Sequence, residues 1–296
     1  MTPVPLIRAF FDEATNTVSY LVADPATRDT AVIDPVLDYD HATGEVNARS
    51  VEAILASAGD AGWRIVRTLE THAHADHLSG SPLIKGRTGA RIGIGVHIKE
   101  VQRIFRPVFD ATDMAADGGD FDDLFGDGEC FRVGDLEFTV MSTPGHTPAD
   151  VTYLVGDAAF VGDTLFMPDY GTARAEFPGG DARLLYRSIQ RLLSLPPATR
   201  IFVCHDYKAP GRDQFAWESS VADQLKGNVH VGQGASEEEF VAMRTARDCR
   251  LATPRLLLPS IQVNIRAGRF PKAEANGVTY LRAPVRFTHA AAGLTG

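Results

Sequence analysis

The chain has 296 residues, 44% of them hydrophobic, and its 29 basic and 38 acidic side chains give a formal net charge of −9. This acidic balance argues against binding to nucleic acid or to an anionic membrane surface, which requires a basic face. Three cysteines do not suggest a disulfide framework, which fits a reducing compartment. Because neither a signal peptide nor a membrane-spanning run is evident, we expect a cytoplasmic protein.

Three apolar or β-branched runs near the N-terminus predict a meander of antiparallel strands, because turn-forming residues separate them. These runs are residues 6–11, 17–22 and 30–33. Residues 36–48 are polar, which favours a loop, and a helix is predicted to begin at Ser50. The apolar centre of residues 63–70 then predicts a buried strand.

This strand leads into the sequence His72-Ala73-His74-Ala75-Asp76-His77, which contains four potential metal ligands. Imidazole and carboxylate are ligands that first-row divalent metals prefer. Alternate residues of an extended segment point the same way, so His72 and His74 can face one point. Asp76 and His77 lie at the turn into a helix and can face a neighbouring point. A lone histidine is more often structural than a ligand, but a cluster of this kind is costly without a cation, and it therefore predicts a metal site.

Two segments that could suggest other ligands are better explained as ordinary structure. Glycine alternates with isoleucine in residues 89–95, which favours a strand over a dinucleotide-binding loop. Residues 107–128 are rich in Asp and Gly but lack the ligand order of a calcium loop, so we expect a solvated loop. A hairpin is predicted over residues 131–140.

Three further candidate ligands follow predicted strands in the second half of the chain. His146 lies in an irregular Pro-Gly-His-Thr loop, Asp163 ends an apolar strand, and His205 ends another. Ligands carried on loops at strand ends, with helices between the strands, predict sheets packed face to face and covered by helices. The later helices are predicted over residues 181–193, 214–225 and 237–246.

The order His-x-His-x-Asp-His, Pro-Gly-His-Thr, Gly-Asp-Thr and a late histidine after an apolar strand resembles the metallo-β-lactamase superfamily. The resemblance extends from about Thr17 to His205. It implies an α+β fold, the αββα four-layer sandwich, with the metal site at one edge between the sheets. We expect a single domain over residues 1–296, in which residues 227–296 form a C-terminal extension packed on the sandwich.

One branch that the resemblance allows is a dizinc hydrolase of the glyoxalase II type. A hydroxide bridging the two zinc ions would attack a thioester such as S-lactoylglutathione. In this branch the matching residues divide into one zinc site, a second zinc site and a bridging carboxylate: His72, His74 and His146; Asp76, His77 and His205; and Asp163.

The other branch is the persulfide dioxygenase, or sulfur dioxygenase. There a single Fe(II) is held by the residues matching His72, His146 and Asp163, a two-histidine, one-carboxylate triad with positions left open for substrate and oxygen. The remaining candidates would orient ligands and bind water: His74, Asp76, His77 and His205. The resemblance favours this branch, and in particular the dioxygenase-type domain of bacterial Blh (β-lactamase-hydrolase-like) proteins, over residues 69–77, 167–177, 204–208 and 258–264.

The dioxygenase resemblance implies that glutathione persulfide, O2 and water react to give glutathione and sulfite, and it suggests a homodimer. The carboxylates of glutathione need cationic partners, for which we propose Arg174 and Lys208, while Tyr170 and Tyr207 supply hydrogen bonds. The alternative for each is an ordinary surface residue.

Three observations qualify the resemblance. Related sequences often have cysteine at the position of Asp150, so a thiol role there does not transfer. The sulfurtransferase-like domain that Blh proteins often carry is not visible in this chain. Cys204, beside His205, is expected to be a buried structural cysteine. A reading from another class, a metal-binding sensor without turnover, is disfavoured by the full set of ligand and substrate residues.

Overall fold

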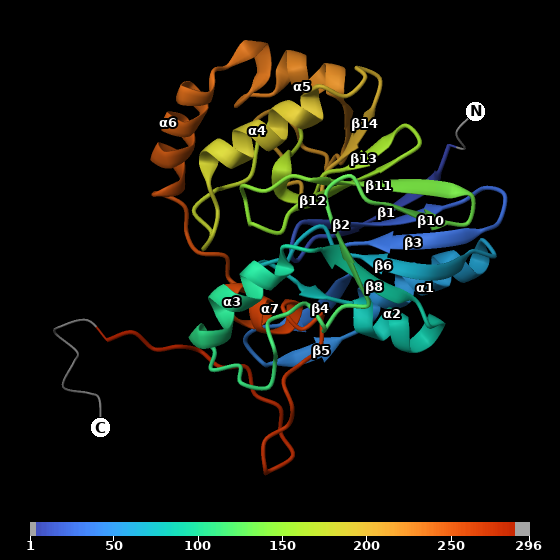
Figure 1. Cartoon of the computed structure of the whole chain (residues 1–296), viewed down its shortest axis with the longest axis vertical. Helices are drawn as coiled ribbons and strands as arrows, with labels where there is room; N and C mark the ends of the chain where they lie inside the picture. The colour runs from blue at the N-terminus through green and yellow to red at the C-terminus, as the bar shows by residue number, and fades with distance from the viewer. Residues whose placement is uncertain (1–3, 288–296) are drawn as a thin grey trace.

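The computed structural model describes residues 4–287. Two six-stranded sheets face each other, and helices cover their outer faces (Figure 1). The first sheet contains, in spatial order, β1 (Leu6–Asp12), β2 (Thr17–Ala23), β3 (Asp29–Ile33), β6 (Arg64–Leu69), β8 (Arg91–Gly95) and β9 (Asp123–Phe125). The second contains β10 (Cys130–Val133), β11 (Leu136–Ser142), β12 (Val151–Val155), β13 (Ala158–Phe160), β14 (Arg200–Phe202) and β15 (Glu218–Ser220).

Helices occupy both outer layers of the sandwich. The first sheet is covered by α1 (Arg49–Asp60) and α2 (Ser81–Thr88), and the second by α4 (Ala182–Leu193) and α5 (Val221–Gly227). Outside these lie α3 (Ile98–Val108), α6 (Glu237–Asp248), which packs on α4, and α7 (Leu257–Asn264). Within residues 4–287 the structure contains no helix with the length and apolar character needed to cross a bilayer.

Strand β2 illustrates why the chain forms four layers. Its residues Val18, Tyr20 and Val22 point into the core between the two sheets, where Phe138 and other residues of the second sheet meet them. Leu21, on the opposite face, packs beneath α1 and α2. Successive residues of a strand point to opposite faces, so a strand that is buried on both sides requires a layer on each. The αββα sandwich predicted from the sequence is confirmed.

The N-terminal meander is confirmed, since β1, β2 and β3 pair antiparallel. The loop predicted over residues 36–48 is wrong, because β4 (Val36–Asp40) and β5 (Glu45–Asn47) form a hairpin that joins β7 (Leu78–Ser79) in a small third sheet. All of β5 is exposed, so its polarity reflects solvent contact and not the absence of a strand.

Two other expectations are also corrected. The Asp- and Gly-rich segment 107–128 is not simply solvated, since Phe109, Met114 and Phe121 enter a buried cluster and β9 lies within it. The helix predicted over 214–225 begins only at Val221, where Ser220 accepts a hydrogen bond from the backbone N–H of Asp223 and caps it.

The described part of the C-terminal extension shares its core with the sandwich. Ile261 and Ile265 pack in the same buried cluster as Ile94, while Val263 packs with Leu37 and Leu78. Helix α7 packs against β7, directly after the ligand-bearing loop, and this contact brings residues near position 264 close to that loop.

Candidate metal centre

The seven candidate ligands lie in loops that follow strands at one edge of the sandwich. β3, β6 and β8 are parallel to one another, as are β13 and β14, so their carboxyl ends meet at common edges. The loops follow β6, β11, β13 and β14, and Asp163 lies in a short 3-10 helix, η1 (Gly162–Thr164). The structure brings together every ligand that the sequence analysis selected: His72, His74, Asp76, His77, His146, Asp163 and His205.

These side chains form two adjacent groups. We call His72, His146 and Asp163 the first ligand group, and their ligand atoms lie within 4.8 Å of one another. The second ligand group is equally compact and consists of His74, Asp76, His77 and His205. The groups meet where His205 Nε2 lies 3.2 Å from Asp163 Oδ1.

In the first group, each histidine has one ring nitrogen engaged by the protein. Nδ1 of His146 lies 2.8 Å from the carbonyl oxygen of Arg174, which can only accept, so Nδ1 carries the proton. Nδ1 of His72 lies 3.1 Å from the hydroxyl of Thr71 and 3.8 Å from Asp150 Oδ1. The Nε2 atom of each ring is therefore available as a ligand.

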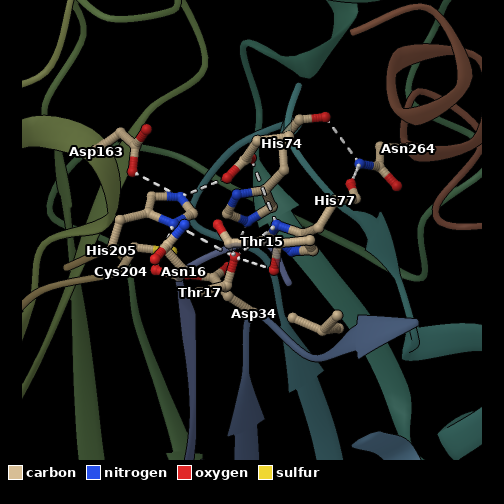
Figure 2. A network of polar contacts seen from close by, with 12 residues as sticks. Thr15, Asn16, Thr17, Asp34, His74, His77, Asp163, Cys204, His205 and Asn264 are labelled. Carbon is tan, nitrogen blue, oxygen red and sulfur yellow. Dashed lines mark hydrogen bonds and ion pairs between the residues drawn. The ribbon is translucent and has the colours of Figure 1, made fainter. Parts of the chain in front are cut away.

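The second group follows the same rule with different partners (Figure 2). Nε2 of His74 lies 3.0 Å from Asp34 Oδ1, which leaves Nδ1 available. Nδ1 of His205 lies 3.2 Å from the carbonyl oxygen of Asn16, which leaves Nε2 available. The carboxylate of Asp76 lies 3.4 Å from His77 Nδ1 and 3.1 Å from His205 Nε2.

The available atoms indicate that a cation fits this centre. Six buried nitrogen and oxygen atoms of the two groups lack a hydrogen-bond partner in the described structure: His72 Nε2, His74 Nδ1, Asp76 Oδ2, His77 Nε2, Asp163 Oδ1 and His205 Nε2. Buried polar atoms are normally hydrogen-bonded, and leaving one without a partner costs about 1–3 kcal/mol. A set of imidazoles and carboxylates whose unpartnered atoms converge is a metal-binding donor set.

Burial tunes the charge state of these ligands. It lowers the pKa of His72 and of His74 well below the usual value, and neighbouring histidines add to the effect, so both rings are neutral and their lone pairs are free. Burial raises the pKa of Asp163 against the pull of His205 and His146. Burial also opposes ionisation of Asp76, but His205 and His77 outweigh it and hold its pKa well below the usual value.

A buried carboxylate that the sequence analysis missed supports the ligand loop. Asp34 accepts hydrogen bonds from the backbone N–H and the hydroxyl of Thr71, and it contacts His74 as described above. Its signal in the sequence is the one that identified Asp163, an acidic residue at the end of an apolar strand. Cys204 is buried with its thiol 3.6 Å from Asp34, and burial raises the pKa of that thiol, as expected for a structural cysteine.

Asn264, at the end of α7, holds the ligand loop from the opposite side. Its Nδ2 donates to the carbonyl oxygens of His74 and His77, each at 2.8 Å, and its Oδ1 accepts from the backbone N–H of Ser79. One buried side chain thus constrains the loop that carries the second ligand group. Its location 187 residues beyond His77 hides this contact from any local sequence pattern.

Helix α6 constrains the segment beside the first ligand group. The buried pair Arg244 and Asp248 lies 2.7 Å apart, and Asp248 accepts from the backbone N–H of Ala175. Arg244 donates to the carbonyl oxygen of Thr172. This segment includes the Arg174 carbonyl that orients His146, so the C-terminal extension contacts both groups through intermediate backbone.

A cavity of about 330 Å³ opens onto the centre, and Asp76, His146 and Asp163 line it. Its aromatic wall consists of Phe166, Tyr170 and Tyr207. Four arginines also line it: Arg174, Arg244, Arg247 and Arg255. Uncharged polar residues complete its polar lining: Thr15, Asn16 and Thr172.

Three of the four predicted substrate residues line this cavity, and one does not. Tyr170, Tyr207 and Arg174 line it, although Arg174 also forms an ion pair with Glu176. Lys208 does not line the cavity, and its ammonium lies 4.3 Å from the ring centroid of Phe215. We therefore do not propose that it binds a carboxylate of the substrate. The sequence analysis missed the other three arginines, because they come from the extension, where no motif marks them.

The fold and this donor set define the class. A model of the metallo-beta-lactamase superfamily matches residues 13–205, and the chain belongs to that superfamily. Its relatives include enzymes that use metal ions, so the chain is by class a metal-binding enzyme of this fold, whereas membership alone does not select a reaction.

Sequence comparison identifies several relatives within this superfamily. The chain is 52% identical over 290 residues to a protein of Burkholderia pseudomallei named a probable metallo-hydrolase, covering 94% of this chain and 98% of that one. It is 48% identical to a beta-lactamase hydrolase-like protein of Xylella fastidiosa, covering 97% of this chain but only 66% of the longer relative. It is 30% identical to the human mitochondrial persulfide dioxygenase ETHE1, covering 89% of each.

Two further relatives represent the dioxygenase and the hydrolase branches. The solved structure of ETHE1 from Myxococcus xanthus superimposes with a TM-score of 0.72 at 30% identity, covering 89% of this chain and 100% of that one. A hydroxyacylglutathione hydrolase of a Methylobacterium species is 34% identical over 206 residues, covering 69% of this chain and 68% of that one.

Proposed function

We propose that the protein is a non-haem Fe(II) persulfide dioxygenase, which oxidises glutathione persulfide with O2 and water to glutathione and sulfite in sulfide detoxification. The observation that carries the proposal is the make-up and position of the first ligand group. It consists of two histidines and one carboxylate, and two of its three members, His146 and Asp163, line the cavity in which a substrate can bind. Of the second group, Asp76 lines the cavity, and its carboxylate lies within 3.4 Å of two histidines of its own group. The first group is therefore better placed to hold one ion beside a substrate.

The first ligand group is a two-histidine, one-carboxylate set of the kind that binds non-haem iron and leaves positions open. His72, His146 and Asp163 would hold the ion, which when bound supplies the redox chemistry that joins oxygen to sulfur. The similarity to proteins named ETHE1, one of which is also named a persulfide dioxygenase, extends over 89% of the chain and supports this choice.

The chain's own residues have distinct roles in this proposal. The Arg174 carbonyl keeps the proton of His146 on Nδ1 and directs Nε2 toward Asp163. Asp76 and His205 offer hydrogen bonds to the water that the reaction consumes. Phe166, Tyr170 and Tyr207 contact one another and form a wall that shields the persulfide sulfur from bulk solvent. A cavity of this size beside the ligands favours turnover over a purely sensory role.

A dizinc hydrolase of the glyoxalase II type is the second candidate. The specific observation in its favour is that His74 Nδ1 and His77 Nε2 are buried without partners, as a second metal would require. The similarity to a hydroxyacylglutathione hydrolase supports the same alternative. In this reaction Asp163, whose carboxylate lies 3.2 Å from His205, would serve as a ligand shared by the two groups.

Substrate turnover distinguishes the two candidates. Anaerobically purified protein is mixed with glutathione persulfide in an oxygen electrode, and sulfite is measured in the same sample. The dioxygenase consumes one O2 for each sulfite formed and does not hydrolyse S-lactoylglutathione. Hydrolysis of S-lactoylglutathione without oxygen uptake would assign the protein to the hydrolase branch.

A further inference from the structure

The four arginines of the cavity fall into two pairs with different electrostatic roles. Arg244 is buried and paired with Asp248, and Arg174 is paired with Glu176 and donates to the carbonyl oxygen of Ala252. Both guanidinium groups therefore form ion pairs within the protein. Their charge is compensated before any substrate arrives.

Arg247 and Arg255 are different. Both are exposed residues of the cavity lining, and neither forms an ion pair with a carboxylate of residues 4–287. An arginine offers five N–H donors in a planar fork that matches a carboxylate. Two such groups without partners at the rim of a cavity are suited to bind the carboxylates of a ligand that enters it.

The overall charge of the chain makes this local arrangement significant. A net charge of −9 repels anions at long range, and in the metal-loaded protein the carboxylates of Asp76 and Asp163 would offset the charge of a divalent ion, so the centre itself adds little attraction for carboxylates. A ligand rich in carboxylates therefore needs local positive charge to compensate for that repulsion. Among the four arginines that line the cavity, Arg247 and Arg255 are the two that form no ion pair with a carboxylate of the described residues.

Taking these observations together, we infer that Arg247 and Arg255 select persulfides whose thiol carrier bears carboxylate groups, and that they do so at the cavity rim, away from the reacting sulfur. The inference rests on the proposed function for the persulfide group, but the recognition of carboxylates is a property of the cavity. We expect Arg247 to contribute more to carboxylate binding than Arg255 does. Arg255 also borders a neighbouring cavity, whose acidic residues partly offset its positive charge: Asp38, Asp40 and Glu45.

The role is specificity-determining, so it affects binding more than the chemical step. Exposed charge pairs contribute modestly, and we expect KM for glutathione persulfide to rise about fivefold in Arg247→Gln and about threefold in Arg255→Gln, with kcat unchanged. The effect is largest at low ionic strength, because exposed charges are screened by salt.

The test is designed so that it does not depend on turnover. Binding of S-methylglutathione and of its diethyl ester to the metal-loaded protein is measured by calorimetry at low salt. The wild-type protein binds the free acid about tenfold more tightly than the ester, and the Arg247→Gln/Arg255→Gln variant loses this preference. Arg250→Gln is the matched control, since Arg250 is exposed, lies three residues after Arg247 just beyond the end of α6, and is outside the cavity lining.

Two outcomes would overturn the inference. One is a double variant that still prefers the free acid. The other is an Arg250→Gln variant that loses the preference equally, which would mean that overall charge and not these two residues governs binding. Absence of oxygen uptake in the wild-type protein would instead refute the proposed function and would leave the binding result to stand on its own.

Discussion

The two ligand groups lie side by side, yet the protein treats them differently. In the second group, Asp76 bridges His77 and His205 at 3.4 and 3.1 Å, and Asn264 pins the loop from α7. In the first group, contacts from helix α6 to the backbone hold the segment that orients His146. Both groups contain buried ligand atoms without partners in the described structure, but two members of the first group line the cavity and one member of the second does. The difference teaches that a complete set of ligands need not mean two equivalent metal sites, because the surrounding residues decide which set faces the substrate.

The strongest way to test the contrast is to remove a ligand of the first group. His72→Ala should abolish iron binding and lower oxygen uptake by more than the about 10–100-fold that losing an outer partner costs. Metal analysis and the oxygen electrode measure both quantities. Iron content and activity close to wild type would contradict the assignment of His72.

The support of the second group can be tested through Asn264. Asn264→Ala leaves the carbonyl oxygens of His74 and His77 without their donor, which should lower the free energy of unfolding by about 2 kcal/mol. Thermal or urea unfolding gives this value. Asn276→Ala is the control, since Asn276 is exposed and its side chain, among the described residues, forms hydrogen bonds only with Val278 and Tyr280 nearby in sequence, and it should change stability by less than about 0.5 kcal/mol. Equal effects of the two changes would refute the role of Asn264.

A ligand of the second group gives the sharpest contrast with His72. In a mono-iron enzyme, His77→Ala removes an outer partner and should lower oxygen uptake about tenfold while iron is retained. In a dizinc hydrolase the same change removes a zinc ligand. A loss of metal and activity as severe as that of His72→Ala would therefore show that the two groups are equivalent.

A pH-dependent effect is expected in the segment behind His146. Nδ1 of His230 accepts from the backbone N–H and contacts the hydroxyl of Thr172, and burial, aided by Arg244 and Arg247, lowers the pKa of His230 to about 4. Protonation of His230 is less favourable in the folded protein than in the unfolded chain, where its pKa is 6.5. As pH falls from 6.5 toward 4 the unfolded chain gains this proton first, so the free energy of unfolding decreases over this interval.

The measurement is the free energy of unfolding of wild type and His230→Gln across this interval. The wild-type protein should lose more stability between pH 6.5 and 4 than the variant does. Parallel pH profiles would show that His230 does not contribute through its titration.

Most of the fold and the clustering of all seven candidate ligands could be predicted from sequence, because ligand-type residues at the ends of apolar strands carry a local signal. His72 to His77 are contiguous, and Asp163 and His205 each end a strand. The residues that hold these ligands could not be predicted in the same way. Asn264 and Asp248 act through backbone atoms 187 and 73 residues away, and no spacing rule connects a side chain to a distant carbonyl or N–H group.

The hairpin over β4 and β5 was missed for a related reason. Val36 and Leu37 of β4 are apolar and buried, but the rest of the hairpin is polar or exposed, and β5 has only three residues, all exposed. Alternation of apolar and polar residues, which predicts a strand, requires a buried face over a longer run. In the same way, Lys208 follows a ligand-bearing strand in sequence, but its ammonium turns toward Phe215. Proximity in sequence to a ligand does not determine the direction of a long side chain.

The central claim is that one metal ion is bound, by the first ligand group. Its most direct test is the metal content of anaerobically purified wild-type, His72→Ala and His77→Ala proteins. The account predicts about one iron per chain in the wild type and in His77→Ala, and none in His72→Ala. Two zinc ions per wild-type chain, with loss of metal in both variants, would contradict it.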